Sequence, residues 1–257
     1  MEQEQEESRE MMEDPNAKLI MQLRADAADP DALARGFQAL RRHAVDDAAR
    51  LRLAEEGAIS VVLGGIERHL GNAMVCENGC FALRGLMMVS ANQLAISTAG
   101  CGLVLSVLRG HAGRREVVQQ ACACLGKLAQ GSALQWPIEQ KADAIHAVLL
   151  AMQQHACPAI HEHGCVLLGL LTVDQPARST IVSAGGVHAV MASLRAHANV
   201  DYVVEQALTA IAGLSVDAEA LDQIISGGGV DLVIDSIRRH GDDNAFFLSG
   251  TQISSAG

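Results

Sequence analysis

Aromatic side chains are scarce in this chain of 257 residues. It contains four Phe, one Trp and one Tyr, or 2% aromatic residues, although 49% of its residues are hydrophobic. Small and aliphatic side chains must therefore fill the core, and such a core suits helices that stack closely. The sequence also lacks any apolar run near the ~18 residues that span a bilayer, so we expect no membrane insertion.

Disulfide frameworks and targeting signals are missing as well. The seven cysteines do not show the pattern of a small secreted domain, and a chain of this length can fold without disulfides. The N-terminal segment is acidic and has no apolar stretch, which a signal peptide requires. We therefore expect a reducing, intracellular compartment, namely the cytoplasm.

Positive charge is limited too. The formal net charge is −11, and residues 1–14 contribute −6 of it, with seven acidic residues against Arg9. Residues 1–15 are therefore predicted to form a solvated, disordered tail. The remainder is mildly acidic and has no basic stripe of the kind that phosphate binding requires, which argues against nucleic acid as a partner.

No arrangement of residues in the sequence indicates catalysis. Cys157, His161 and Cys165 have the most metal-like spacing, but Cys165 belongs to a predicted core stripe, so a zinc site is disfavoured. The glycine run 227–229 lacks the Lys-Ser/Thr pair of a phosphate-binding loop. We expect a protein that is not an enzyme and has no metal, no cofactor and no small-molecule substrate. A metal-dependent enzyme is the remote alternative.

What the sequence does contain is an internal repeat. Small residues recur at intervals of 43, 42, 43 and 43 residues, at Gly36, Gly79, Ala121, Gly164 and Ala207. Histidines recur at intervals of 42, 44, 42 and 43 residues, at His69, His111, His155, His197 and His240. Two independent landmarks with one period indicate a repeat array, in which each unit buries its apolar face against its neighbours.

Each unit is predicted to contain three helices. A short first helix is expected near residues 46–55, 91–98, 136–141, 176–183 and 218–226. A small-residue joint follows it, at Glu56-Gly57-Ala58, Ala99-Gly100, Ala142-Asp143-Ala144, Ala184-Gly185-Gly186 and Gly227-Gly228-Gly229. The second helix ends at the recurring histidine, whose imidazole is expected to cap the last carbonyls of that helix. The longer third helix carries the small-residue column, which predicts tight contact with the helix of the next repeat.

These units divide the chain as follows. A repeat domain over 16–250 opens with a capping half-repeat at 16–43, and residues 251–257 form a flexible C-terminus. The repeats span about 46–89, 90–131, 132–173 and 174–215, with an incomplete one at 216–250. The last unit has too short a third segment, so it either caps the array or belongs to a longer one.

The three-helix unit resembles the armadillo repeat. Residues 184–194 resemble the second helix of that family, and residues 203–214 resemble the third. The resemblance covers about residues 17–240 and implies an all-α, right-handed superhelix. It also implies that the third helices line a concave groove that binds extended peptides or other proteins.

One family feature is absent. The nuclear-import members use Trp and Asn columns to clamp basic peptides. The matching positions here are Phe81, Ala123, Val166 and Thr209 for Trp, and Gly85, Lys127, Leu170 and Gly213 for Asn. Neither column is kept, which argues against binding of nuclear-import cargo.

A polar column on the third helices is the candidate binding site. Its members can all donate hydrogen bonds, and they are Arg35, Asn78, Gln120, His163 and Gln206. Such a ladder could pair with the backbone of an extended ligand, or it could be a solvated face. The wider stripe adds Gln38, Arg42, Phe81, Lys127 and Tyr202 as groove candidates, beside Met74, Glu116, Val166 and Leu170.

Other notable residues are assigned to the core. Cys80, Cys122 and Cys165 recur in the repeat's apolar column and are predicted to be buried and reduced. Trp136 either covers the edge of the core or anchors a partner, and we favour the first. Together these patterns predict a non-enzymatic scaffold that binds a protein or an extended peptide in its groove, within a multiprotein complex. The alternative is a structural subunit of a large assembly, held through its edges and ends.

Overall fold

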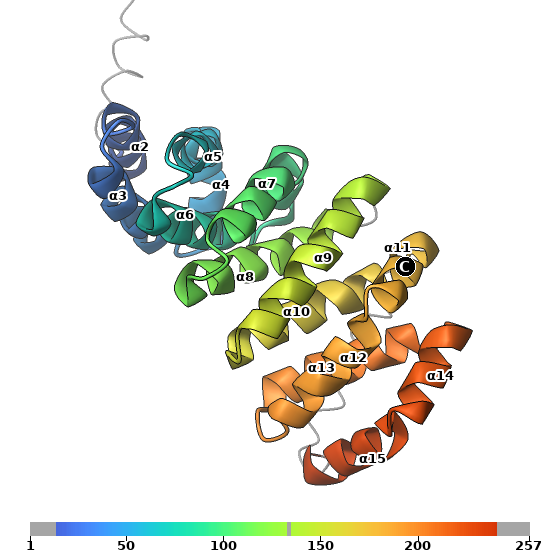
Figure 1. Ribbon diagram of the computed structural model, residues 1–257. Coiled ribbons are helices and arrows are strands. Elements are labelled where there is room, and N and C mark those ends of the chain that lie inside the picture. Colours follow the sequence, from blue (N-terminus) through green and yellow to red (C-terminus); the bar gives the residue numbers. More distant parts are fainter. Residues whose placement is uncertain (1–13, 133–134, 241–257) are drawn as a thin grey trace, which may run out of the picture. The chain divides into compact units, whose positions relative to one another are not determined.

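The computed structural model describes residues 14–132 and 135–240, and within them it contains fourteen helices and no strand (Figure 1). The helices are α2 (Pro15–Ala25), α3 (Pro30–His43), α4 (Asp47–Glu55), α5 (Ala58–Arg68), α6 (Ala73–Leu86), α7 (Ser90–Gly110), α8 (Arg115–Ser132), α9 (Ile138–Gln154), α10 (Pro158–Leu171), α11 (Gln175–Ser183), α12 (Gly186–Ala196), α13 (Asp201–Leu214), α14 (Ala218–Ser226) and α15 (Gly229–His240). The all-α prediction is confirmed. The predicted tail, the C-terminal stub and the flexible C-terminus fall largely or wholly outside the described residues.

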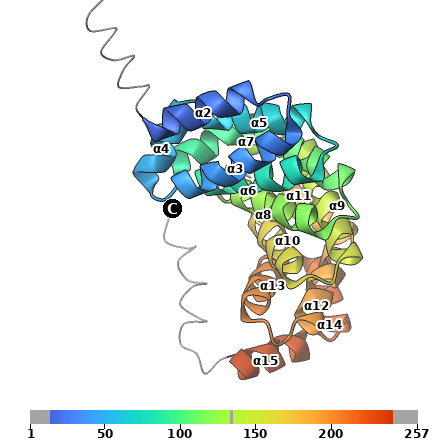
Figure 2. The same cartoon turned by 90° about the vertical axis from the view of Figure 1, so that its left-hand side faces the viewer.

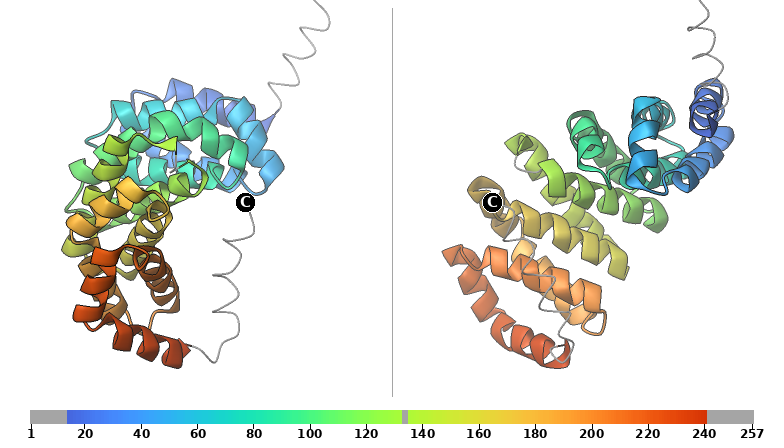
Figure 3. Two further views of the ribbon diagram at one scale, coloured as in Figure 1. Left: turned by 90° about the vertical axis from the view of Figure 1, so that its right-hand side faces the viewer. Right: turned by 180° about the vertical axis from the view of Figure 1, so that it is seen from behind.

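The helices belong to two compact units, the first of which ends at Ser132. The first unit contains α2 to α8 and the second contains α9 to α15. Within the first unit, the third helices α3, α6 and α8 pack in succession, as Figure 2 shows. Within the second unit, α10 and α13 pack side by side, as the views in Figure 3 show.

Aspartate side chains cap the N-termini of three short first helices. Asp46 accepts a hydrogen bond from the backbone N–H of Ala49 at 2.7 Å, at the start of α4. Asp174 and Asp217 do the same at the starts of α11 and α14, at 3.2 and 3.1 Å. Each side chain satisfies an N–H that has no partner inside the helix, so these residues fix where the helices begin.

Three of the predicted joints are confirmed by left-handed glycines. Gly57, Gly185 and Gly228 have φ values of 93°, 81° and 73°, which let the chain turn sharply between a first and a second helix. The joint Ala99-Gly100 instead lies inside α7, whose segments Ser90–Ser97 and Gly100–Gly110 are bent by 70°. Among the described residues no single helix is long and apolar enough to cross a membrane, although this bent pair passes by length and composition.

The predicted joint at Ala142-Asp143-Ala144 is wrong. These residues lie within α9, a continuous helix that replaces the expected pair of helices. The motif contains no glycine, and its two alanines are the strongest helix formers, so nothing there favours a break. The third repeat therefore starts with one long helix.

The recurring histidines join neighbouring repeats. Nε2 of His69 donates to the carbonyl of Ala27 at 2.9 Å, and Nε2 of His111 donates to the carbonyl of Leu70 at 2.8 Å. In the second unit, His240 contacts the carbonyl of Ala198 in the same way at 2.9 Å. The expected capping of the histidine's own helix is therefore corrected for these three: each ring bonds the turn of the preceding repeat.

The small-residue column is also explained differently from the prediction. A Cβ added at Gly79 would lie 2.5 Å from Cγ1 of Ile66, on the second helix of the same repeat. A Cβ at Gly164 would lie 2.5 Å from Sδ of Met152, again on the second helix of the same repeat. The tight contact therefore holds a repeat together internally; it is not a contact with the next repeat.

The cysteine predictions hold. Cys80, Cys122 and Cys165 are buried, and none of the three forms a disulfide. Burial raises the pKa of Cys165 to about 12, so its thiol stays protonated and unreactive. Trp136 is 5% exposed, which agrees with the favoured interpretation that it covers the core edge.

Candidate binding surface on the third helices

The third-helix face comprises the side chains of α3, α6 and α8 in the first unit, and of α10 and α13 in the second, that point away from the core. On α6, Val75, Gly79 and Leu83 are buried, whereas Asn78 and Phe81 are only partly covered. The helical period thus separates a core stripe from a stripe open to partners. All ten predicted groove residues lie on these helices.

Two arginines surround Phe81 in the first unit. The guanidinium carbons of Arg41 on α3 and Arg84 on α6 each lie 4.6 Å from the centroid of the Phe81 ring. Such cation–π contacts hold the aromatic ring and the charges in fixed positions. The sequence singled out Phe81 but missed both arginines. The signal was present, since Arg84 lies one helical turn after Phe81 and Arg41 occupies the same place one period earlier.

The structure brings some predicted residues together. Nε2 of Gln38 donates to Oδ1 of Asn78 at 3.4 Å, across α3 and α6. Gln120 on α8 is partly buried, and its Oε1 has no hydrogen-bond partner among the described residues. Arg35 and Arg42 are exposed on α3. The ladder in the first unit is therefore a partly bonded row with one buried acceptor that a ligand could satisfy.

Acidic groups lie nearer the start of the same helices. Burial, and then the charge of Glu116, raise the pKa of Glu77 above its ordinary value. Glu77 lies on α6 and Glu116 on α8, the next third helix. The sequence named Glu116 in the wider stripe and missed Glu77.

Basic groups lie in the C-terminal halves of the third helices in the first unit. The members of this basic edge are Arg41, Arg42, Arg84 and Lys127. The segments 36–43, 80–86 and 122–132 that carry them contain no Asp or Glu. Helix C-termini favour positive charge, which stabilises Arg41, Arg42 and Arg84 in the last turns of α3 and α6. Nζ of Lys127 also donates to Oε1 of Gln130 at 3.0 Å.

The second unit has a different character. His163 and Gln206 are partly buried, and Tyr202 is 46% exposed. The positions that match Arg84 in the repeat are Gly169 and Ala212, so the basic edge has no counterpart there. All three lie on the third-helix face, His163 on α10 and the other two on α13.

A buried polar cluster lies behind α10. His161 Nε2 donates to the carbonyl of His155 at 2.9 Å, and its Nδ1 lies 2.6 Å from Oγ of Ser193. The rings of His161 and His197 are 4.6 Å apart. Within the described part of the chain, no group of three or more His, Cys, Asp or Glu side chains could hold a metal ion.

Comparison with known proteins identifies the fold. No protein-family model and no curated protein matches the sequence. Among solved structures, an engineered protein has 18% identity and a TM-score of 0.73, covering 93% of this chain and 96% of its own. A designed armadillo repeat protein in complex with the peptide (KR)4 has 14% identity and a TM-score of 0.70, covering 93% of this chain and 97% of its own.

A third solved structure, of computationally designed armadillo repeat proteins for modular peptide recognition, has 16% identity and a TM-score of 0.70. It covers 89% of this chain and 92% of its own. These likenesses, together with the helices described above, show the fold: the chain has the fold of an armadillo-type α-solenoid.

Proposed function

We propose that this solenoid is a non-enzymatic scaffold that binds a protein or an extended peptide on its third-helix face, which we take to be its concave side. The observation that carries the proposal is the cluster of Arg41, Phe81 and Arg84. Arginine and aromatic residues are enriched among the side chains that dominate binding energy at interfaces. Here they are held in place by mutual contacts before any partner arrives, which lowers the entropy that binding must overcome.

The charge of this face indicates the chemistry of the partner. One of the solved structures is described as bound to (KR)4, a basic peptide. On the present chain the edge formed by Arg41, Arg42, Arg84 and Lys127 is itself basic. We therefore propose an acidic partner segment, whose carboxylates would pair with the guanidinium groups. Assembly within a multiprotein complex, a cytoplasmic location and the repeat boundaries given above remain predictions.

Selection from a random peptide library tests the proposal. Peptides enriched on the purified protein should be rich in Asp and Glu. Replacement Phe81→Ala should weaken their binding by about 30-fold, because a central interface residue contributes about 2 kcal/mol or more. The affinities are measured by calorimetry, beside a thermal melt of each variant.

Arg52→Ala is the matched control, since Arg52 is an exposed arginine on α4 and lies off the third-helix face. The affinity of Arg52→Ala for the enriched peptides should equal that of the unmodified protein. Enrichment of basic peptides, or equal affinities for Phe81→Ala and the control, would reject this surface as the binding site.

A further inference from the structure

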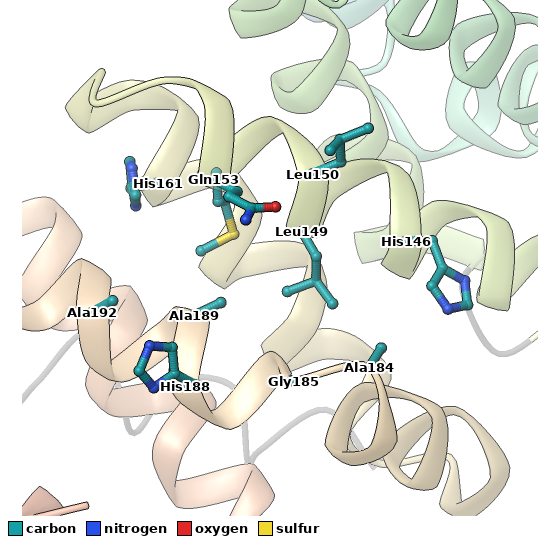
Figure 4. A pocket seen from close by; sticks show the side chains of 11 residues that line it. His146, Leu149, Leu150, Gln153, His161, Ala184, Gly185, His188, Ala189 and Ala192 are labelled. Carbon is teal, nitrogen blue, oxygen red and sulfur yellow. The ribbon is translucent and has the colours of Figure 1, made fainter.

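A cavity of about 560 Å³ lies between α9 and α12 in the second unit. Most of its wall is apolar, formed by Leu149, Leu150, Met152, Ala184, Ala189 and Ala192. In Figure 4 the side chains of Leu149 and Gln153 extend from α9 toward α12, which carries Ala189 and Ala192. Leu150 is 47% exposed, so apolar surface is left open to solvent that a bound molecule could cover.

The register of the repeats explains why this space is open. Ala189 lies eight residues before His197, and the matching positions on the other second helices and on α9 are Val61, Leu103, Ala147 and Leu232. A larger aliphatic side chain thus stands in three of the repeats where α12 has only a methyl group. α9 is also continuous through its predicted joint. This repeat therefore has no separate first helix that could contribute side chains to the cavity wall.

The polar groups around the cavity offer hydrogen bonds without a fixed charge. Nδ1 of His146 donates to the carbonyl of Ala142 at 2.8 Å, because a carbonyl can only accept. This leaves Nε2 of the neutral ring as an acceptor. His188 and Gln153 are exposed beside it. His161 also lines the cavity, but both of its nitrogens are occupied by the protein. The lining contains no Asp, Glu, Lys or Arg.

We propose that this cavity binds a small, uncharged and mainly apolar organic molecule that donates a hydrogen bond to His146. Its volume falls within the range of about 300–1,000 Å³ that small-molecule sites occupy, and such sites combine apolar walls with a few polar groups. A permanently charged ligand would lose its hydration here without gaining a counter-charge. The cavity lies on second helices, so it does not depend on the third-helix face or on a peptide partner.

A matched pair of fluorescent probes tests the ligand class. N-phenyl-1-naphthylamine is uncharged, aromatic and carries one N–H donor, and its emission rises in apolar surroundings. Its 8-sulfonate has the same skeleton with a fixed negative charge. The uncharged probe should bind saturably with one site per chain, and the sulfonate should bind more weakly. Equal or tighter binding of the sulfonate would contradict the proposed chemistry.

Two variants test whether the uncharged probe binds in this cavity. Ala189→Leu introduces the side chain that Leu103 and Leu232 already have at this register, and it should abolish saturable binding of the uncharged probe. Ala196→Leu adds the same atoms at an exposed position of α12 outside the cavity and should leave binding unchanged. A thermal melt shows whether each variant folds.

A readout at the cavity itself completes the test. The methyl resonance of Met152, assigned by comparison with Met152→Leu, should shift on addition of the uncharged probe. It should not shift when the probe is added to folded Ala189→Leu. Saturable binding that persists in Ala189→Leu, or the absence of binding to the unmodified protein, would overturn the proposal.

Discussion

At the scale of single residues, two glycines with the same local structure are expected to respond in opposite ways to alanine. Gly79 and Gly64 both lie inside helices, where replacement by alanine normally stabilises by about 0.5–1 kcal/mol. A Cβ at Gly79 would lie 2.5 Å from Ile66 Cγ1, whereas a Cβ at Gly64 meets nothing within 4 Å. We expect Gly79→Ala to destabilise by about 1–2 kcal/mol, because overpacking a core outweighs helix propensity.

Gly64→Ala is the matched control for that substitution and should raise the free energy of unfolding. Urea titration followed by circular dichroism measures both. If Gly79→Ala were as stabilising as Gly64→Ala, the close packing of α6 on α5 would be wrong.

The buried histidines of the second unit predict how stability depends on pH. Burial is the main cause that lowers the pKa of His161 below its ordinary value of 6.5, against the opposing effect of the hydrogen bond to His155. The charge of His197 lowers it further, and burial lowers the pKa of His197 as well. The unfolded chain therefore binds these protons more tightly than the folded chain. The free energy of unfolding should fall as pH drops through 6.5 and level off above it.

His161→Gln removes one of these titrating groups and should flatten the fall between about pH 7.5 and about pH 5.5. His188→Gln removes an exposed imidazole and should leave the slope as it is. Urea titrations across this range give the slopes. A slope unchanged by His161→Gln would show that His161 does not carry the effect.

At the scale of helices, the left-handed joints should be sensitive to any side chain. Gly185 has φ of 81°, and a Cβ added there meets nothing within 4 Å. The effect of Gly185→Ala is therefore conformational alone, and we expect it to destabilise by about 1–2 kcal/mol. Thermal melts compare it with Gly64→Ala, which has an ordinary helical backbone and should move the melting temperature the other way. A stable Gly185→Ala protein would show that the joint between α11 and α12 can relax.

These joints also show how far the sequence could predict the helices. Gly57, Gly185 and Gly228 marked real turns, because glycine is the residue that tolerates positive φ. Ala142-Asp143-Ala144 stood at the same register and was read as a turn by analogy, yet its residues favour a helix and form one. Register alone places a repeat, while local propensity decides whether the chain bends within it.

At the scale of the whole molecule, the repeat period was sufficient to predict the fold class, since a period of about 43 residues admits few architectures. The candidate site was harder to predict. Phe81 was found because it matches the Trp position of the nuclear-import armadillo proteins. Its contacts with Arg41 and Arg84 depend on side-chain directions, which the sequence pattern alone does not give. The cavity beside Ala189 was not anticipated, because it results from space that neighbouring helices leave unfilled.

The net charge of the molecule and the charge of its basic edge have opposite signs. The chain carries a net charge of −11, yet segments 36–43, 80–86 and 122–132 of α3, α6 and α8 carry basic side chains and no Asp or Glu. An acidic partner would therefore be repelled at long range by the molecule and attracted at short range by one edge of it. Added salt screens the distant charges more than the close contacts, so it suppresses the repulsion first.

The histidines that follow α5 and α7 and end α15 have a consequence for the history of such a chain. At His69, His111 and His240 the acceptor is a main-chain carbonyl of the preceding unit, and every amino acid supplies a main-chain carbonyl. A newly duplicated copy of one of these three units therefore brings its own donor and finds an acceptor in whichever unit comes before it. The order of the units can change, and their sequences can diverge, without the loss of this junction.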